Sequence, residues 1–518
     1  MQTTNLTNET TDTRSSSPAA AEPRVPMPVK RSREEQRKAS SEELARQEEY
    51  LRKAQIYTAQ LAGILGRTPT FHVQNFGCQM NARDAEKLCG ILRSAGYTEI
   101  GEESADFVIY NTCTVRDNAD QHFYGRLGRA SHYKKHSPYM KIAVCGCMTQ
   151  EESAVEKIKK SYPYVDLIFG THNLFCFPQY LCEVYENKNG GFDPKGHKIT
   201  KIWDATDEIV EDLPVERKFS YKSGINIMFG CDNYCTYCIV PYVRGHERSR
   251  EPQDIIRECE KLVADGVVEV MLLGQNVNSY GRDLETPCSF AELLSAVAEV
   301  PGLRRVRFMT PHPKDMGTDV LEVIRDHPNI ARHIHFPLQS GSNEILRRMN
   351  RRYTREQFLA KAEEIRRILP DAAITTDIIA GFPGETRSDV DDTVDVIQRV
   401  GFDNAYTFIY SPRKGTPAAS MEQVPKEEVQ EGFDRILSAV QESARNRAAL
   451  LQGKTMTALA EEVNTQDPQY ITCRLSNNII VHVRGDASMI GHFYDVTLDE
   501  CKNFYYFGTV ISENEKGY

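Results

Sequence analysis

The segment from Ile225 to Arg250 reads INIMFGCDNYCTYCIVPYVRGHERSR, a short apolar run followed by three closely spaced cysteines. The apolar run predicts a buried β-strand, and Cys231, Cys235 and Cys238 follow it in a C-x3-C-x2-C spacing. Three thiolates at this spacing can hold three irons of a 4Fe-4S cluster, which leaves the fourth iron open to a substrate or cofactor. Structural zinc is the alternative, but zinc takes four ligands and only His246 lies close enough in sequence to add one.

Strand-like runs recur after this segment, each followed by a helical stretch. The six runs end near Gly230, Gly274, Thr310, Gln339, Gly381 and Tyr410. This repeat predicts an α/β core over residues 217–448, built as a partial (β/α)6 barrel. In barrels of this type the active site is built from residues at the carboxyl ends of the strands.

A second α/β alternation precedes the barrel, over residues 67–190, and predicts a small doubly wound domain. Cys78, Cys113 and Cys147 each follow a predicted strand of this domain, where the ligand sites of open α/β sheets lie. We therefore expect a second thiol triad, with Gly77 and Gly146 in tight turns beside a bulky ligand and helix N-termini that lower the thiol pKa values. The alternative is that these are buried cysteines in apolar turns. Cys145 lies inside a predicted strand and is expected to be an ordinary core residue.

The two ends of the chain differ from this pattern. Residues 1–66 form a polar extension, predicted to be disordered up to about residue 26 and to contain a solvated helix from Ser32 to Lys53. Residues 451–515 alternate short β-branched and aromatic runs with polar turns, which predicts a small all-β barrel. A plain accessory β domain is the alternative there, because acidic residues outnumber basic ones.

Composition limits the class of protein. The chain has 518 residues, a net charge of −10 and fourteen cysteines. It contains no apolar run long enough to cross a membrane and no export signal, so we expect a cytoplasmic protein. Many thiols in such a chain indicate metal or redox chemistry rather than disulfides. The acidic balance argues against a general nucleic-acid coat protein but permits a local basic surface.

The cysteine motif resembles that of the radical SAM superfamily, in which an aromatic residue precedes the last cysteine, as Tyr237 does here. The resemblance implies that S-adenosylmethionine chelates the open iron, that Tyr237 lies near its adenine, and that reductive cleavage gives a 5′-deoxyadenosyl radical.

The whole arrangement resembles the methylthiotransferases, whose C-terminal TRAM domain binds tRNA. The resemblance implies two 4Fe-4S clusters, an auxiliary one on Cys78, Cys113 and Cys147 and a radical SAM cluster on Cys231, Cys235 and Cys238. It also implies that one S-adenosylmethionine donates a methyl group, that a second supplies the radical, and that sulfur passes through the auxiliary cluster.

Four further segments resemble the branch of this family that acts on N6-dimethylallyladenosine at position 37 of tRNA. They are LLGQNVNSYG (272–281), HFPLQSGS (335–342), DIIAGFPGET (377–386) and FIYSPRKGTPAA (408–419). The alternatives are a methylthiotransferase for threonylcarbamoyl-adenosine in tRNA or for a ribosomal protein. A non-catalytic iron-sulfur electron carrier or RNA-binding sensor is the rival from another class.

Other candidate site residues are polar or basic groups near these motifs. Tyr237, Gln275, Asn276, Arg248 and Asp377 are expected to contact the cofactor, and Arg244, Arg347, Arg348 and Tyr410 to contact tRNA. Further basic side chains, at 246, 250, 351 and 352 and at 126, 129, 134 and 135, are candidates for phosphate contacts or solvated helix faces. The expected partners are tRNA, an unidentified electron donor and a sulfur source, with the chain acting as a monomer away from membranes.

Overall fold

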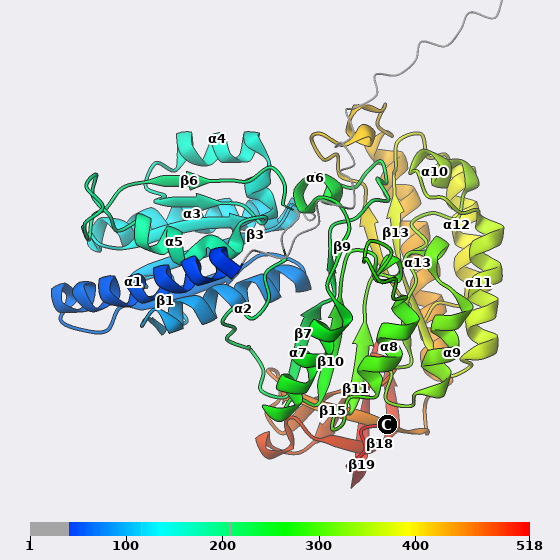
Figure 1. Ribbon diagram of the computed structural model, residues 1–518. Helices are drawn as coiled ribbons and strands as arrows, with labels where there is room; N and C mark the ends of the chain where they lie inside the picture. Colours follow the sequence, from blue (N-terminus) through cyan, green and yellow to red (C-terminus); the bar gives the residue numbers. More distant parts are fainter. Residues whose placement is uncertain (1–40, 115–116, 207–208) are drawn as a thin grey trace, which may run out of the picture.

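The computed structural model describes residues 41–114, 117–206 and 209–518, which form two α/β units and a C-terminal β-barrel (Figure 1). The first α/β unit lies beside the second, and the barrel lies below the second in this view. No helix within the described ranges is both long and apolar enough to cross a membrane.

The first unit is built on a parallel six-stranded sheet with the order β2-β1-β3-β4-β5-β6. The order reverses between β1 and β3, which confirms the predicted doubly wound fold. All residues of β3 and β4 are buried, as expected for central strands of a parallel sheet covered by helices on both faces. The elements are β1 (Thr70–Asn75), α2 (Gln79–Ser94), β2 (Thr98–Glu99), β3 (Phe107–Thr112), α3 (Asp117–His136), β4 (Lys141–Gly146), α4 (Glu152–Ser161), β5 (Leu167–Phe169), α5 (Phe177–Glu183) and β6 (Ile199–Lys201).

The N-terminal helix α1 (Ser41–Leu65) contains residues 41–53 of the predicted helix, and most of these are exposed or half-buried. It extends twelve residues beyond the predicted end at Lys53 and packs against α5. Ala54, Tyr57 and Leu61 recur at helical spacing and are buried in the core of the first unit. Residues 32–40 of the predicted helix lie outside the described residues.

The second unit is an open barrel of six parallel strands, as predicted. Its strands form two three-stranded sheets, β7-β10-β11 and β12-β13-β14, and a single bridge from Val306 to Ile330 joins them. The strands are β7 (Lys222–Asn226), β10 (Glu269–Leu273), β11 (Arg305–Phe308), β12 (His333–His335), β13 (Ala373–Ala380) and β14 (Asn404–Ile409). The helices around them are α7 (Pro252–Ala264), α8 (Phe290–Ala298), α9 (Thr318–Asp326), α10 (Asn343–Arg348), α11 (Arg355–Ile368), α12 (Arg387–Val400) and α13 (Lys426–Ala449).

The C-terminal unit is a closed barrel with the strand order β15-β16-β17-β19-β18, which confirms the predicted all-β barrel. Its interior holds Ala458, Ile471, Val481, Val496 and Tyr506, all fully buried. Four of its strands coincide with the predicted runs, whereas β15 was not predicted. The strands are β15 (Thr455–Val463), β16 (Tyr470–Leu475), β17 (Ile480–Arg484), β18 (Phe493–Lys502) and β19 (Tyr505–Glu513).

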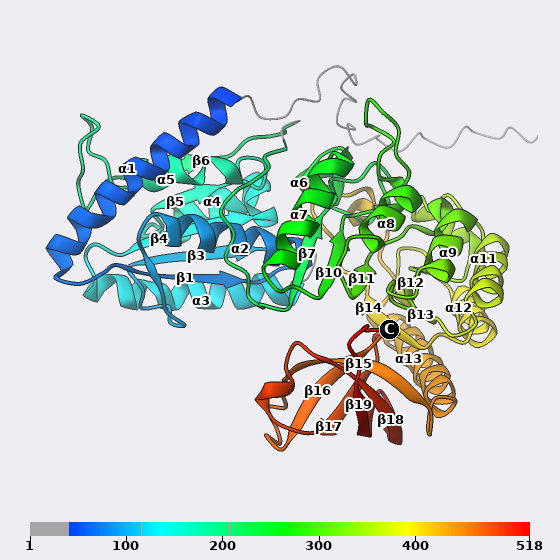
Figure 2. The same cartoon turned by 60° about the horizontal axis from the view of Figure 1, so that its bottom comes forward.

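The closed barrel docks at the end of the second unit where the strands begin (Figure 2). Arg307, near the start of β11, donates to the carbonyl oxygens of Leu475 and Ser476 at 2.8 and 3.2 Å. Lys222, the first residue of β7, forms an ion pair with Glu461 at 2.8 Å. The opposite end, where the strands finish and the predicted site residues lie, is therefore not covered by the closed barrel.

Candidate functional site

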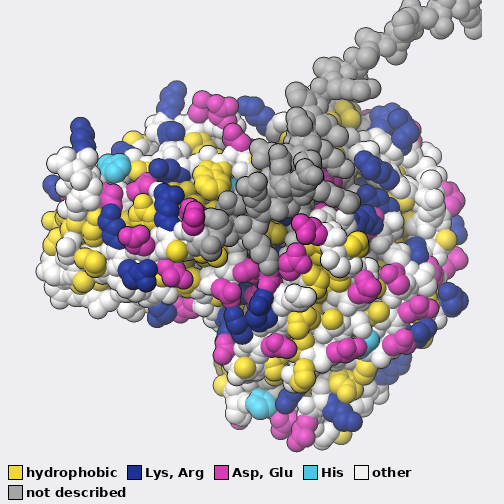
Figure 3. Space-filling model, viewed as in Figure 1, with side chains coloured by type: hydrophobic (Ala, Val, Ile, Leu, Met, Phe, Trp, Pro, Cys, Tyr) yellow, Lys and Arg dark blue, Asp and Glu magenta, His cyan; other side chains and the backbone are white. Residues whose placement is uncertain are grey.

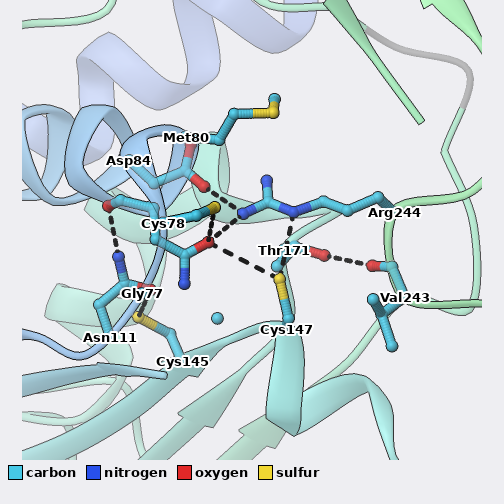
Figure 4. A network of polar contacts seen from close by, with 12 residues as sticks. Gly77, Cys78, Met80, Asp84, Asn111, Cys145, Cys147, Thr171, Val243 and Arg244 are labelled. Carbon is cyan, nitrogen blue, oxygen red and sulfur yellow. Dashed lines mark hydrogen bonds and ion pairs between the residues drawn. The ribbon is translucent and has the colours of Figure 1, made fainter. Parts of the chain in front are cut away.

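The three N-terminal cysteines lie at the carboxyl edge of the first sheet, on both sides of the strand-order reversal. Cys78 caps α2 after β1, Cys113 follows β3, and Cys147 follows β4. The sulfur atoms of Cys78 and Cys147 lie 4.0 and 3.7 Å from a single atom, Oδ1 of Asn81 (Figure 4). The structure thus gathers the loops that carry the predicted auxiliary triad.

Asn81 holds these loops together. It is fully buried, and its amide nitrogen donates to the carbonyl oxygen of Thr112, next to Cys113, at 2.6 Å. Its own backbone carbonyl accepts from the side chain of Asn111 at 2.7 Å. One asparagine therefore contacts two of the thiols and the chain beside the third.

The pKa of Cys147 differs from the expectation that a helix N-terminus would lower it. The pKa of this thiol is raised to about 11, mainly by burial and to a smaller degree by the neighbouring Cys113 and Cys78, although Arg244 lowers it. Burial favours the neutral thiol more strongly than the local cation favours the thiolate. Each thiol in this group disfavours the ionisation of its neighbours. Bound iron would stabilise all three as thiolates.

The two glycines beside the cysteines are required by close contacts within the protein. Gly146 has a φ of 100°, and a Cβ there would lie 2.2 Å from the carbonyl oxygen of Thr112. A Cβ on Gly77 would lie 2.3 Å from the amide nitrogen of Asn81. The glycines let β4 approach β3, and let the Cys78 loop approach Asn81.

The second cysteine loop leaves the barrel after β7. Two short strands, β8 (Met228–Phe229) and β9 (Arg248–Ser249), pair antiparallel and close the base of the loop. Within it, the N–H of Cys231 donates to Gly245 O at 3.2 Å and that of Cys238 donates to Cys235 O at 2.9 Å. The side chain of Asn350 donates to the carbonyl oxygens of Asn233 and Tyr234 at 3.2 and 2.9 Å, so the turn after α10 fixes the loop from the outside.

Hydrogen-bond donors face two of these three sulfurs. Nδ2 of Asn233 lies 3.5 Å from Cys231 Sγ, and Nη1 of Arg351 lies 3.5 Å from Cys235 Sγ. Burial, reinforced by Cys235, raises the pKa of Cys238 to about 12. Ligand thiolates of iron-sulfur clusters are commonly stabilised by such N–H···S contacts.

The spacing of the thiols fits a cluster better than a single ion. In a zinc site all ligands surround one ion at about 2.3 Å, whereas each thiolate of a cubane binds its own iron. Within residues 41–114, 117–206 and 209–518, no three His, Cys, Asp or Glu side chains gather closely enough to hold one ion. His246, the candidate fourth zinc ligand, instead bonds to Asp232 through Nδ1 at 2.7 Å.

Several buried polar atoms at the barrel mouth have no hydrogen-bond partner among the described residues. Gln275 donates to the sulfur of Met80, but its Oε1 is unpaired, and Asn276 donates to Asp315 at 2.8 Å while its Oδ1 is unpaired. Buried side-chain nitrogen or oxygen atoms without a hydrogen-bond partner also occur in Asn226, His246, Asn278 and Glu385. Buried polar groups normally have partners, so this group of atoms fits a polar ligand such as S-adenosylmethionine.

Tyr237 and Tyr410 lie on the two sides of a third ring. The ring centroid of Phe382 is 6.4 Å from that of Tyr237 and 5.4 Å from that of Tyr410. Phe382 belongs to the loop after β13, which turns through Gly381 and Gly384 at φ values of 72° and 81°. The structure thus brings the predicted cofactor residue and the predicted substrate residue to one aromatic wall.

Asp377 and Arg248, the other predicted cofactor contacts, lie in different places. Asp377 on β13 is half-buried and pairs with His335 at 3.3 Å. Arg248 instead faces the junction with the first unit, where it lines a cavity of about 70 Å³ with His172 and Lys87. Its guanidinium donates to Arg244 O at 3.3 Å and lies over the ring of Phe229, which does not fit the predicted contact with a cofactor carboxylate.

Arg244 does not fit its predicted role as a phosphate contact. Its side chain is 7% exposed and is bonded to Asp84, Asn81 and Cys147. The two other predicted tRNA contacts lie on the surface of α10: Arg347 is 71% exposed, and both it and Arg348 pair with Glu344. Figure 3 shows basic and acidic side chains interspersed on that face of the molecule rather than a continuous basic stripe.

The remaining basic candidates divide between ion pairs and exposed positions. Arg250 is buried against Glu211 and Glu258, and Arg351 lies beside Cys235. Arg126 pairs with Glu103, and Lys134 pairs with Asp166. Arg129, Lys135 and Arg352 are exposed.

Sequence reasoning missed Asn81 and Glu385, and it took Arg351 for a phosphate contact rather than a partner of Cys235. A signal existed for Asn81, because it lies three residues after Cys78 and so faces the same side of the helix that Cys78 caps. None existed for Arg351, whose contact with Cys235 joins segments more than a hundred residues apart.

Comparison with protein families gives three matches. Residues 225–397 match the radical SAM superfamily, residues 70–170 match an uncharacterized protein family, UPF0004, and residues 449–511 match the TRAM domain.

Two curated relatives are similar over most of the chain. A tRNA-2-methylthio-N(6)-dimethylallyladenosine synthase of Lachnoclostridium phytofermentans is 54% identical, covering 88% of this chain and 98% of its own. One of the same name from Acetivibrio thermocellus is 43% identical, covering 91% and 97%.

Among solved structures, the radical S-adenosylmethionine methyltransferase TsrM from Kitasatospora setae matches with a TM-score of 0.50. The match has 13% sequence identity and covers 68% of this chain and 77% of TsrM, which shows a shared fold.

Proposed function

This chain belongs to the family of tRNA-2-methylthio-N(6)-dimethylallyladenosine synthases, which are radical SAM methylthiotransferases, and we propose on that basis that it methylthiolates tRNA. The proposed substrate is N6-dimethylallyladenosine at position 37, and the product carries a methylthio group at C2. That aromatic C–H bond is too weakly acidic for a side-chain base, so a radical route is required.

One observation carries this proposal: two groups of three thiols come from two different domains and face the same junction. Ile239 and Val243, which follow Cys238, pack directly against Cys147. A simple electron carrier does not need two triads that each lack a fourth protein ligand, whereas two open clusters suit a reaction that joins a sulfur source to a radical source.

Cys78, Cys113 and Cys147 are the proposed ligands of the auxiliary cluster, and Cys231, Cys235 and Cys238 those of the radical SAM cluster. When bound, these groups supply sulfur through the auxiliary cluster, a radical from one S-adenosylmethionine and a methyl group from a second. An external electron donor and a sulfur source are then required as partners.

The chain's own residues position the reactants. The unpaired atoms of Gln275 and Asn276 offer hydrogen bonds to the cofactor at the barrel mouth. Tyr237, Phe382 and Tyr410 form an apolar wall that suits adenine or the prenyl group and limits the entry of water.

Contact with tRNA is proposed to involve Arg347 and Arg348 on α10, which also fixes the radical SAM loop. Thr236, between Cys235 and Cys238, donates to the carbonyl oxygen of Arg348 at 2.8 Å. The same helix therefore presents positive charge to solvent on one side and touches the cysteine loop on the other. Phosphate contacts of this kind position a nucleic acid without reading its sequence.

Mass spectrometry of tRNA nucleosides from a strain lacking this gene tests the proposal. We expect 2-methylthio-N6-dimethylallyladenosine to disappear and N6-dimethylallyladenosine to accumulate, and the intact gene to reverse both changes. An unchanged methylthio signal would contradict the proposal. Loss of the 2-methylthio derivative of threonylcarbamoyl-adenosine, or of a methylthio group on a ribosomal protein, would identify one of the two alternative substrates.

A further inference from the structure

A short helix, α6 (Val240–Arg244), follows the radical SAM cysteines and lies against the auxiliary thiol site. It begins two residues after Cys238 and lies between the first and the second α/β unit (Figure 1). Its C-terminal end is held by hydrogen bonds from two other segments of the protein. Thr171 of the first unit donates to the carbonyl oxygen of Val243 at 3.0 Å, and the N–H of Cys231 donates to that of Gly245 at 3.2 Å.

Arg244, the last residue of α6, enters the auxiliary thiol site from the other domain (Figure 4). Its Nε donates toward Cys147 Sγ at 3.3 Å, and its Nη2 donates to Asn81 Oδ1 at 2.5 Å and to Asp84 Oδ2 at 2.9 Å. The guanidinium thus contacts one thiol directly and, through Asn81, the backbone beside another.

The charges of this contact are arranged for a buried thiolate. A buried arginine is costly unless it is paired, and Asp84 on α2 supplies the partner. The planar guanidinium can bind Asp84 and Asn81 with one nitrogen while Nε remains directed at the sulfur. Asp84 therefore holds Arg244 in place, and Arg244 faces Cys147.

We propose that Arg244 is a positioning residue of the auxiliary cluster, supplied by the radical SAM domain. Its N–H···S bond completes the surroundings of Cys147, so the cluster reaches its working reduction potential only when the two domains are docked. Hydrogen bonds to cluster sulfurs are a principal determinant of that potential. The inference rests on the proposed function, because it requires an auxiliary cluster on Cys78, Cys113 and Cys147.

The test uses the full chain with Cys231, Cys235 and Cys238 replaced by alanine, so that only the auxiliary cluster remains. Its midpoint potential is measured by redox titration monitored by electron paramagnetic resonance. We expect Arg244→Gln to lower the potential, because it removes a charged donor to Cys147. Arg244→Lys should restore the potential only partly, because one ammonium group cannot bind Asp84 and point at the sulfur in the same way.

A second variant keeps the inference testable if Arg244→Gln does not fold. Asp84→Asn keeps an oxygen that can accept from Nη2 of Arg244 and so hold it toward Cys147, but removes the neutralising negative charge, so the potential should rise. The matched control is Arg325→Gln, which changes the last-turn arginine of α9, 49% exposed and far from either triad, and should leave the potential unchanged.

Two failures are distinguishable. If the chain with Cys231, Cys235 and Cys238 replaced by alanine binds no iron rather than about four irons, the auxiliary cluster and with it the proposed function are wrong. If the cluster forms in this chain and its potential is unchanged by Arg244→Gln and Arg244→Lys, the role of Arg244 is overturned. A potential that is unchanged by Asp84→Asn would overturn it as well.

Discussion

Asn81 lies at the centre of the auxiliary thiol site. Its side chain receives a hydrogen bond from Arg244 and donates one to Thr112, and its Oδ1 lies within 4.0 Å of two sulfurs. No water reaches this residue, so none of these bonds can be replaced by solvent if the side chain is removed. The position of three loops therefore depends on one amide group.

Asn81→Ala is expected to destabilise the protein and to weaken cluster binding. It leaves Thr112 O and one Arg244 donor unsatisfied in a buried site, at a cost of about 1–3 kcal/mol. Denaturant unfolding measures the stability, and iron analysis of the reconstituted protein measures the cluster. Asn189→Ala, at an exposed loop position, is the control. Equal stability and equal iron content in Asn81→Ala would contradict the assigned role.

Glu385, in the loop after β13, gives a prediction about pH. Burial raises the pKa of this carboxyl to about 7; the Gly381 N–H opposes the shift and Asp389 adds to it. The unfolded chain releases the same proton near pH 4.3, so between about pH 4.3 and 7 the folded state binds more protons than the unfolded state. The free energy of unfolding therefore falls as pH rises through this range.

Glu385→Gln should remove that loss. In protein free of S-adenosylmethionine, we expect the variant to gain stability relative to the parent between about pH 5 and 8, by up to about 3 kcal/mol. Denaturant unfolding at a series of pH values measures the difference. The control is Glu363→Gln at an exposed position on α11. A constant difference across this pH range would show that Glu385 is not protonated in the folded state.

Residues whose role depends on local spacing could be predicted from the sequence, and those that depend on distant contacts could not. The six cysteines and Tyr237 belong to short motifs, and the structure places the cysteines in two groups and Tyr237 in an aromatic wall. Arg244 also lies near a motif, but its partners are on α2, about 160 residues earlier in the chain. Sequence proximity to a cysteine loop suggested a surface role, whereas the docking of two domains buries the side chain.

At the level of elements, strand β11 joins the second α/β unit to the closed barrel. Arg305 and Arg307 are buried there, and Glu269 on β10 pairs with both, at 3.7 and 2.9 Å. The two arginines also donate to backbone carbonyls of the closed barrel, so Glu269 compensates the charges that hold that barrel in place.

Glu269→Gln is expected to lower the free energy of unfolding by about 3–5 kcal/mol, because it leaves two buried cations without a counter-charge. Denaturant unfolding checks this value. Glu299→Gln serves as a control, since Glu299 is 69% exposed and pairs with a half-buried histidine. A change in Glu269→Gln as small as that in the control would show that the carboxylate is not needed at this junction.

The elements that could not be predicted are those whose stability comes from packing. The charged run up to Lys53 predicted a solvated helix, and the buried apolar residues of α1, Ala54, Tyr57 and Leu61, lie beyond that run. Strand β15 contains Ala458, Ala460 and two glutamates, a composition that favours helix, and it forms a strand because β16 and β18 pair with it on both sides.

At the level of the whole molecule, the site and the closed barrel lie at opposite ends of the six-stranded unit. The closed barrel contacts β7 and β11 at the end of the six-stranded unit where the strands begin. The cysteine loops and Gln275 follow the other ends of the strands. The proposed tRNA contact on α10 therefore lies on another part of the surface than the closed barrel.

Arg347→Ala should weaken tRNA binding with little change in kcat. It removes an exposed charge on α10, so we expect the slope of log Kd against log salt to fall by about one. Binding measurements at several salt concentrations check this, and Arg325→Ala is the control at an exposed site on α9. An unchanged Kd and salt slope would exclude Arg347 from the tRNA contact.

The central claim is that two thiol triads act together on tRNA, and a single assay tests it most directly. Reconstituted, reduced protein is incubated with S-adenosylmethionine and tRNA containing N6-dimethylallyladenosine, and both 5′-deoxyadenosine and the methylthiolated nucleoside are measured by mass spectrometry. We expect the parental chain to form both, and the chain with Cys78, Cys113 and Cys147 replaced by alanine to form 5′-deoxyadenosine but no methylthiolated product. Methylthiolated product from that variant would contradict the account.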